Sequence, residues 1–206
     1  AYTDVSYLAL RDQPVLEDTI KEDLTIGIGR EVDRVGVNGQ GNVLTGEPLG
    51  LAQAPQIPNV FMGSGNGAAP TYALLSKMER VLGRSNGDFA PSWVTSPEGR
   101  SALRGCMING TGSLPVWRDG RVLDYPAFAT SNIPATTTQG SGTGLTTLLF
   151  GSFEEVRVGM WGAVDILVNP YQLASSGMVR IRALLDIDIQ FPRVGAFVKS
   201  TDLQGV

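Results

Sequence analysis

The feature that most constrains the fold of this 206-residue chain is an apolar residue at every fourth position near its start. The stripe consists of Leu16, Ile20, Leu24, Ile28 and Val32, with Val35 one turn further on. This period matches one side of an α-helix, so the pattern predicts a helix of roughly 35 Å over Pro14–Val37. We expect Asp12 to cap its first turn, and Asn38 and Gly39 to end it.

A stripe of this length needs another element that covers it. No second helical pattern of similar length follows, so the expected partner is a β-sheet and the predicted fold class is α+β. Gly27 and Gly29 lie inside the helix, where each weakens it by up to about 1 kcal/mol. Their presence predicts that a neighbouring element approaches the helix closely at this point.

The rest of the chain alternates turn-rich stretches with short elements. Helices are predicted from Thr71 to Leu82 and from Pro97 to about Leu103, the second with Ser96 as its cap. The stretches Arg104–Asp124 and Pro134–Gly144 are expected to be loops. Strands are predicted at Ser92–Thr95, Ala127–Ile133, Thr146–Phe150, Val156–Met160, Val164–Val168, Met178–Ile189 and Val194–Lys199.

Composition excludes most catalytic and metal chemistry. The chain has no histidine, which removes the commonest general base, the commonest metal ligand and every Ser-His-Asp or Cys-His system. Cys106 is the single cysteine, so an internal disulfide and a cysteine-rich zinc site are impossible. The net charge of -4 argues against a dedicated nucleic-acid binder. No segment resembles a signal peptide or a membrane span. We therefore predict no catalytic, cofactor-binding or metal-binding residues.

A few sequence features could still suggest a functional site. Asp186 and Asp188 alternate with apolar residues. The two carboxylates could form an acid–base pair on one face of a strand, or they could be the solvated face of a half-buried strand, which is the interpretation we favour. Glu154 and Glu155 are interpreted as an exposed pair. Glycine-rich loops occur at residues 38–41 and 63–67, and we interpret them as a helix end and a loop rather than as phosphate sites.

Five passages follow one another in a familiar order. The long helix runs into Asn38–Gly41 and then Thr45–Leu51. The four later passages are Trp93–Pro97, Leu123–Pro126 with Thr130–Pro134, Leu149–Phe153, and Ala183 followed by Ala196–Lys199. Each motif is short, but their order and spacing across nearly the whole chain resemble tailed-phage major capsid proteins with the Hong Kong-type fold.

The resemblance implies a division of the chain into two domains. Residues 1–48 and 157–185 would form a peripheral domain, with the long helix as its spine. Residues 49–156 and 186–206 would form an axial domain. The turn-rich segment Arg104–Asp119 is the candidate for its tip at the fivefold and quasi-sixfold axes, although an ordinary surface loop is the competing interpretation.

The resemblance also implies a function, which is that of a structural shell subunit and not of an enzyme. Copies would assemble into pentamers and hexamers that enclose double-stranded DNA without specific contacts. The expected location is the virion, with assembly in the bacterial host cytoplasm, and further partners would be a scaffolding segment, a maturation protease and a portal. The alternatives are an encapsulin-like protein compartment, or a small α+β binding module or carboxylate-dependent enzyme that uses Asp186 and Asp188.

The sequence departs from the family pattern in two ways. It starts too late to hold the N-terminal arm and extended hairpin of the family, so we expect a truncated or processed form. Some relatives cross-link through a lysine on that hairpin, an asparagine on the peripheral domain and a nearby glutamate. The corresponding stretch Ala174–Asp188 has neither asparagine nor glutamate, so we expect no self-catalysed cross-linking.

Overall fold

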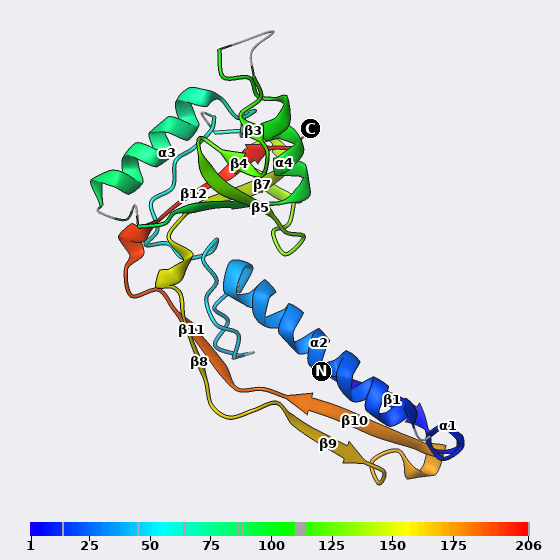
Figure 1. The fold of residues 1–206 in the computed structure, drawn as a ribbon. Coiled ribbons are helices and arrows are strands. Elements are labelled where there is room, and N and C mark those ends of the chain that lie inside the picture. Colours follow the sequence, from blue (N-terminus) through cyan, green and yellow to red (C-terminus); the bar gives the residue numbers. More distant parts are fainter. Residues whose placement is uncertain are drawn as a thin grey trace.

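The computed structural model describes residues 1–13, 15–44, 46–63, 65–85, 87, 89–109 and 114–205, which form a long arm and a rounded body (Figure 1). We use "arm" for the described residues of 1–50 and 157–190. We use "body" for those of 51–156 and 191–205. The chain therefore passes between the two parts more than once. Residue 1 lies in the arm, and residue 205 lies in the body.

The arm is a helix on a three-stranded antiparallel sheet. The strand order is β1 (Tyr2–Ser6), β10 (Met178–Leu184) and β9 (Asp165–Asn169). Helix α1 (Tyr7–Asp12) leads from β1 into the long helix α2 (Val15–Asn38), which runs back along one face of the sheet (Figure 1). The predicted sheet partner for the apolar stripe is thus confirmed.

Alternation along β10 explains why α2 covers only one face. Val179, Ile181 and Ala183 are buried toward α2, whereas Arg182 and Leu184 are exposed on the other face. In a strand, successive side chains point to opposite faces of the sheet. The arm therefore has one covered face and one face open to solvent.

A two-stranded ribbon connects the arm to the body, and its position corrects one prediction. We predicted a single strand over Met178–Ile189, but the strand is broken at Leu185 and Asp186. Beyond the break, β11 (Ile187–Gln190) leaves the arm's sheet and pairs with β8 (Arg157–Met160). An apolar residue occurs at every second position from Val179 to Ile189, across the break, so this pattern gave no sign of the change of partner.

The body contains a mixed sheet flanked by two helices, α3 (Tyr72–Arg84) and α4 (Pro97–Gly105). The strand order is β12-β7-β2-β5-β4-β3, with β6 pairing to β7. Among the described strands, β2 and β5 pair in parallel, and the other strand pairs are antiparallel. The strand bounds are β2 Ser92–Thr95, β3 Trp117–Arg118, β4 Arg121–Val122, β5 Tyr125–Ala129, β6 Thr137–Gln139, β7 Gly142–Gly151 and β12 Phe197–Gln204. The 3₁₀ turns η1 (Phe153–Glu155) and η3 (Val194–Ala196) lie in the body, and η2 (Ala174–Ser176) lies in the arm.

The core of the body is built around an aromatic pair. The rings of Trp93 and Phe150 stack with centroids 4.0 Å apart, and the ring of Tyr125 meets Phe150 edge-on at 5.3 Å. Leu75 and Met78 of α3 pack into the same cluster and are fully buried. Burying an apolar side chain of this size contributes about 1.5–3 kcal/mol relative to exposure, so this cluster stabilises the body from within.

The helix caps agree with the sequence in one case and not in another. The Ser96 hydroxyl accepts a hydrogen bond from the backbone N–H of Gly99 at 3.0 Å, as expected of an N-cap. The prediction that Asp12 caps the long helix is wrong, because Asp12 is the last residue of α1 and α2 begins at Val15. Pro14 lies outside the described residues.

Two further expectations are corrected. A Cβ placed on Gly27 or Gly29 would meet no described atom within 4 Å, so no described element makes the predicted close approach. The expected loop Pro134–Gly144 contains β6 and the start of β7. The threonines of this segment fit a pleated, half-buried surface, which the abundance of glycine and serine obscured.

Candidate assembly interface

The glycines at the end of α2 serve a tight backbone crossing. The N–H of Gly39 donates to the Val35 carbonyl at 2.8 Å, and the N–H of Gly50 donates to the Gly39 carbonyl at 2.8 Å. A Cβ on Gly39 would lie 2.3 Å from the Pro48 carbonyl oxygen, and one on Gly50 would lie 2.2 Å from the Gly39 nitrogen. Only glycine fits these two positions, and these N–H groups are already satisfied within the chain. The passage fixes residues 48–50 against the end of α2 and offers no phosphate cradle.

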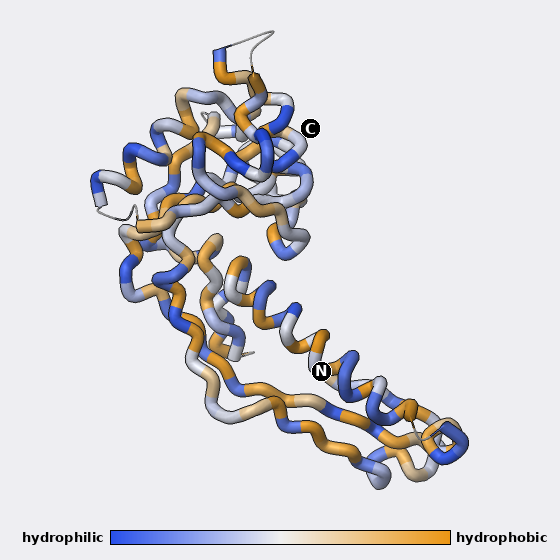
Figure 2. Tube along the Cα trace, in the orientation of Figure 1, coloured by the Kyte–Doolittle hydropathy of each residue, from blue (hydrophilic) through white to orange (hydrophobic). Residues whose placement is uncertain are grey.

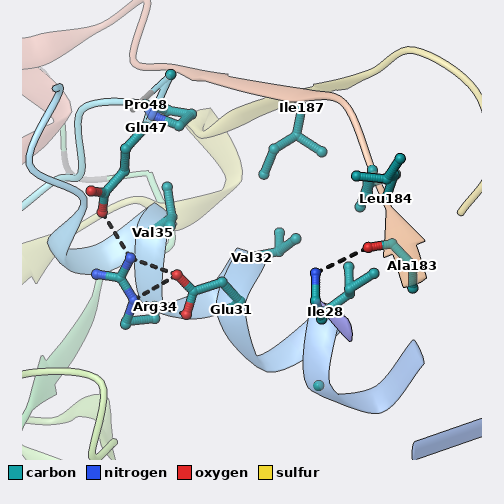
Figure 3. Close-up of a pocket in the computed structure, with 14 residues that line it drawn as sticks. Ile28, Glu31, Val32, Arg34, Val35, Glu47, Pro48, Ala183, Leu184 and Ile187 are labelled. Carbon is teal, nitrogen blue, oxygen red and sulfur yellow. Dashed lines mark hydrogen bonds and ion pairs between the residues drawn. The ribbon is translucent and has the colours of Figure 1, made fainter. Parts of the chain in front are cut away.

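An ion-pair network connects α2 with the loop that follows it. The Arg34 guanidinium donates to the Glu31 carboxylate at 2.6 Å and to the Glu47 carboxylate at 2.8 Å (Figure 3). Hydrogen bonding by Arg34 lowers the pKa of Glu31, and the two carboxylates raise the pKa of Arg34. The network therefore links α2 to the loop that follows it.

Beside this network lies a groove of about 410 Å³. Its walls are α2, residues 46–48 and the break between β10 and β11 (Figure 3). Ile28, Val32 and Val35 contribute apolar side chains from the helix. The amino group of Ala1 donates to the Ala183 carbonyl at 3.0 Å near one side. The lining offers no nucleophile and base in contact, so the groove has the character of an apolar slot and not of an active site.

The predicted carboxylate candidates do not form a catalytic pair. Asp186 is exposed at the strand break. The Asp188 carboxylate accepts hydrogen bonds from the N–H of Ile189 at 2.9 Å and the Gln190 side chain at 3.0 Å. Glu154 is exposed, and Glu155 pairs with Arg193 at 3.0 Å. These contacts are the local hydrogen bonds and ion pairs of a solvated surface.

Two buried polar residues on β12 escaped the sequence analysis. The Lys199 ammonium donates to the carbonyls of Ala52 at 2.7 Å and Ala54 at 2.8 Å. Desolvation by burial lowers the pKa of Lys199. The Asp202 carboxylate accepts from the backbone N–H groups of Met62 at 2.8 Å and Gly63 at 2.9 Å.

These two residues anchor loops to the last strand. The carbonyls bonded by Lys199 lie just after residue 50, where the chain passes from the arm to the body. The N–H groups bonded by Asp202 lie at the start of the glycine-rich loop 63–67. Because β12 is buried on both faces over most of its length, its sequence does not alternate and the polar residues gave no signal of their role.

The candidate tip of the body is described only in part. Residues 110–113 of Arg104–Asp119 lie outside the described residues. On either side of them the backbone is paired, with the N–H of Ile108 donating to Leu114 at 3.0 Å and that of Val116 to Cys106 at 2.8 Å. These paired segments project from the end of the body that is remote from the arm (Figure 1).

The open face of the arm carries an ion pair that holds the first strand. Asp4 and Arg180 lie directly opposite each other on β1 and β10, with two hydrogen bonds of 2.6 and 2.7 Å. The same guanidinium lies 4.5 Å from the centre of the Tyr2 ring. Hydrogen bonding by Arg180 lowers the pKa of Asp4. The pair fixes β1 against β10 over the pH range in which Asp4 is ionised.

Large apolar side chains are exposed on and beside the strands of the arm. Trp161 is 67% exposed beside the ribbon, Met160 on β8 is 64% exposed and Leu167 on β9 is 52% exposed. Further exposed apolar residues on or beside the strands of the arm include Tyr2, Val158, Val168, Tyr171 and Leu184. Exposed apolar groups that gather in one region of a protein mark interaction surfaces. Aromatic residues are enriched where proteins bind one another.

Other site classes find no support in the part of the chain that is described. There, no three or more of the side chains His, Cys, Asp and Glu come together as metal ligands. No described helix is long and apolar enough to cross a membrane. Cys106 is half-buried, and burial raises the pKa of its thiol, which disfavours a reactive thiolate.

Comparison with known proteins identifies the family. The phage capsid family model matches residues 1–202. The chain belongs to the phage capsid family. Membership indicates a structural protein and not an enzyme, in agreement with the prediction from the sequence. The predicted α+β class and Hong Kong-type capsid fold are confirmed as well.

Individual relatives are distant in sequence and close in fold. The chain is 25% identical over 183 residues to the major capsid protein of Halomonas phage phiHAP-1, covering 88% of this chain and 28% of that protein. It resembles the capsid of an empty GTA particle with a TM-score of 0.74 at 15% identity, covering 98% of this chain and 72% of that one. It also resembles the holo-SrpI encapsulin complex from Synechococcus elongatus PCC 7942, with a TM-score of 0.59 at 18% identity and coverages of 99% and 72%.

Proposed function

We propose that this capsid-family protein is the structural subunit of an icosahedral phage or prophage shell, in which copies assemble into pentamers and hexamers around double-stranded DNA. The observation that carries the proposal is the family match over residues 1–202, joined to an arm that leaves one sheet face and its apolar residues uncovered. Contacts between unlike surfaces that close around a rotation axis produce rings, and rings that meet at other axes produce a closed particle.

The two parts of the molecule fit two roles in such a shell. We propose residues 1–48 and 157–185 as the peripheral domain and residues 49–156 and 186–206 as the axial domain, with Arg104–Asp119 at the axis. Pairing of β11 with β8 favours moving the last boundary to follow Gln190, so that the ribbon is not divided. The long helix and the arm's sheet would then lie in the shell wall as rigid struts.

The charge of the chain suits a container for DNA. A net charge of -4 provides no excess of cations to bind phosphates tightly, and tight phosphate contacts would hinder both packaging and release. We propose that DNA is held without specific contacts. A scaffolding segment, a maturation protease and a portal are the further partners we propose, with the virion as the final location and the host cytoplasm as the site of assembly.

A protein compartment of the encapsulin type is the second candidate. Its support is the similar fold of the SrpI encapsulin. A DNA container and a protein container differ in what the assembled particle holds. The contents of the particle therefore separate the two functions, whereas the subunit fold does not.

The test is to express the protein, with any residues that flank this sequence in its gene, and to examine it by sedimentation velocity and electron microscopy. We expect pentamers, hexamers or closed shells. Shells purified from infected or induced cells should contain nuclease-protected DNA, and a protein cargo instead would favour the compartment. A protein that stays monomeric at high concentration, with and without a scaffolding protein, would contradict the shell function.

A further inference from the structure

Strand β9 is an open edge of the arm's sheet. It is the last strand in the order β1-β10-β9, and within the described residues no other strand pairs with it. Figure 2 shows apolar residues along this strand on the outer side of the arm. An edge strand presents unpaired N–H and C=O groups that can pair with another chain, and proteins usually protect it with charges, proline or a bulge. Ile166–Val168 has none of these.

The hydrogen bonds of the sheet show which groups face outward. The N–H and C=O of Ala183 both bond to Ala1, the residue that precedes β1. Because successive residues of a strand direct these groups to opposite sides, Arg182 directs its own toward β9, where it lies opposite Leu167. Leu167 therefore bonds inward to β10, and its neighbours Ile166 and Val168 direct their N–H and C=O groups to the open edge.

This edge is complementary to a second copy of itself. If two β9 strands run antiparallel about a twofold axis at Leu167, Ile166 faces the partner's Val168. The two residues direct their backbone groups toward each other, as a hydrogen-bonded antiparallel pair requires. Asp165 would then face the partner's Asn169, and like charges do not meet. A register centred on Ile166 would instead oppose Asp165 to the partner's Leu167.

Side chains favour the same arrangement. Ile166 and Val168 lie opposite the buried Ala183 and Ile181, on the same face of the sheet, so pairing would extend this apolar face from one arm to the other. On the open face, Leu167 would meet the partner's Leu167. Pro170 lacks an N–H, which confines the pairing to this short segment.

We propose that β9 pairs with β9 of a second copy about a twofold axis at Leu167, joining the arms of two subunits into one six-stranded sheet. The proposal rests on the proposed shell function, because it names one of the subunit contacts. The other open edge, β1, is the weaker partner. Its outward backbone groups belong to Tyr2, Asp4 and Ser6, and pairing it with β9 would propagate from copy to copy without closing.

A symmetric disulfide tests the register. In the Cys106→Ser background, Leu167→Cys places two thiols across a non-hydrogen-bonded pair, where Cα atoms lie about 4.5 Å apart and within disulfide range. Oxidation of soluble and assembled fractions should give covalent dimers on a non-reducing gel. The matched control is Leu184→Cys, which is exposed on the same face but one strand further from the axis. It should stay monomeric.

Proline substitutions provide a second test that separates pairing from folding. Val168→Pro removes an outward N–H and leaves the bonds to β10 intact, so the sheet should fold while the cross-linked yield of Leu167→Cys falls by roughly tenfold. Leu167→Pro removes an inward N–H and should instead disrupt the arm, which circular dichroism and proteolysis would detect.

The outcomes distinguish this proposal from the shell function. Dimers of Leu167→Cys in either fraction, lost in Val168→Pro, support the pairing. Shells that form normally while Leu167→Cys yields only monomers in both fractions overturn the pairing and leave the shell function standing. Dimers without any shells support the pairing and count against the shell function.

Discussion

The body and the arm are built from similar elements, but they bury their residues in different ways. In the body, Trp93, Phe150 and Leu75 are each at most 1% exposed within one cluster packed by strands and helices. In the arm, α2 packs on one face of the sheet, and only two of its residues, Ile28 and Val35, are buried. All four residues of β8 are exposed. The contrast indicates that the body is stabilised by its own core, whereas the arm needs neighbouring subunits to cover it.

The largest effect is expected from truncating the centre of the body. Trp93→Ala should lower the free energy of unfolding by about 3–5 kcal/mol, because it removes a fully buried ring stacked on Phe150 and leaves a cavity. Urea titration followed by far-ultraviolet circular dichroism measures the change. The matched arm variant Leu24→Ala removes a half-buried side chain and should cost less than half as much. Equal losses would contradict the contrast between the two parts.

The next largest loss of stability is expected where Lys199 holds the segment that contains Ala52 and Ala54. Lys199→Met should destabilise the chain by about 2 kcal/mol, because the carbonyls of Ala52 and Ala54 lose their donor while buried. Lys77→Met, at an exposed position of α3, is the control and should change little.

The pH dependence of the same residue provides a separate check. Since burial lowers the pKa of Lys199 from 10.5, the unfolded state binds more protons between the folded pKa and 10.5. The free energy of unfolding should therefore rise with pH across that window, by an amount absent from Lys199→Met. The same slope in both proteins would show that Lys199 is not the group responsible.

A smaller effect is expected at a helix cap in the body. Ser96→Ala should cost about 1 kcal/mol, because the hydroxyl that accepts from Gly99 at the start of α4 is lost. The midpoint of urea unfolding reports the loss. Ser96→Asp should recover most of it, and a midpoint that does not recover would indicate that the buried hydroxyl contact to Thr146 matters more than the cap.

The smallest global effect is expected in the arm. Asp4→Asn removes the carboxylate that pairs with Arg180 and should loosen β1 without altering the body. Because the folded pKa of Asp4 lies below 3.8, the stabilisation is complete above that pH and is lost as pH falls through the folded pKa. Faster amide exchange confined to residues 1–6 is the predicted result, and equal acceleration in β2 and β7 would contradict it.

The sequence predicted the parts of the fold that are governed by local periodicity. The stripe from Leu16 to Val35 indicated α2, its one-sidedness indicated a sheet beneath it, and Ser96 before Pro97 indicated a cap. The strand break at Leu185 could not be predicted, because an apolar residue still occurs at every second position from Val179 to Ile189 and the change lies in the partner strand. Partner choice is a tertiary property, and local patterns do not carry it.

The buried polar anchors of the body and the candidate interface were less predictable than the fold. Lys199 and Asp202 lie in a strand buried on both faces, where alternation disappears and a polar residue has no pattern to break. The open edge at Ile166–Val168 depends on which strands flank β10, so only the sheet order reveals it. The absence of histidine, by contrast, excluded whole classes of active site from composition alone.

Hydrogen exchange of the unassembled chain and of assembled shells tests the central contrast most directly. The body strands β2, β7 and β12 should be protected in both states. The arm strands β1, β8 and β9 should exchange rapidly in the unassembled chain and become protected in shells, since neighbouring subunits would then cover them. Arm strands that are protected equally in both states, or that remain unprotected in intact shells, would contradict the claim that the arm is completed by other copies.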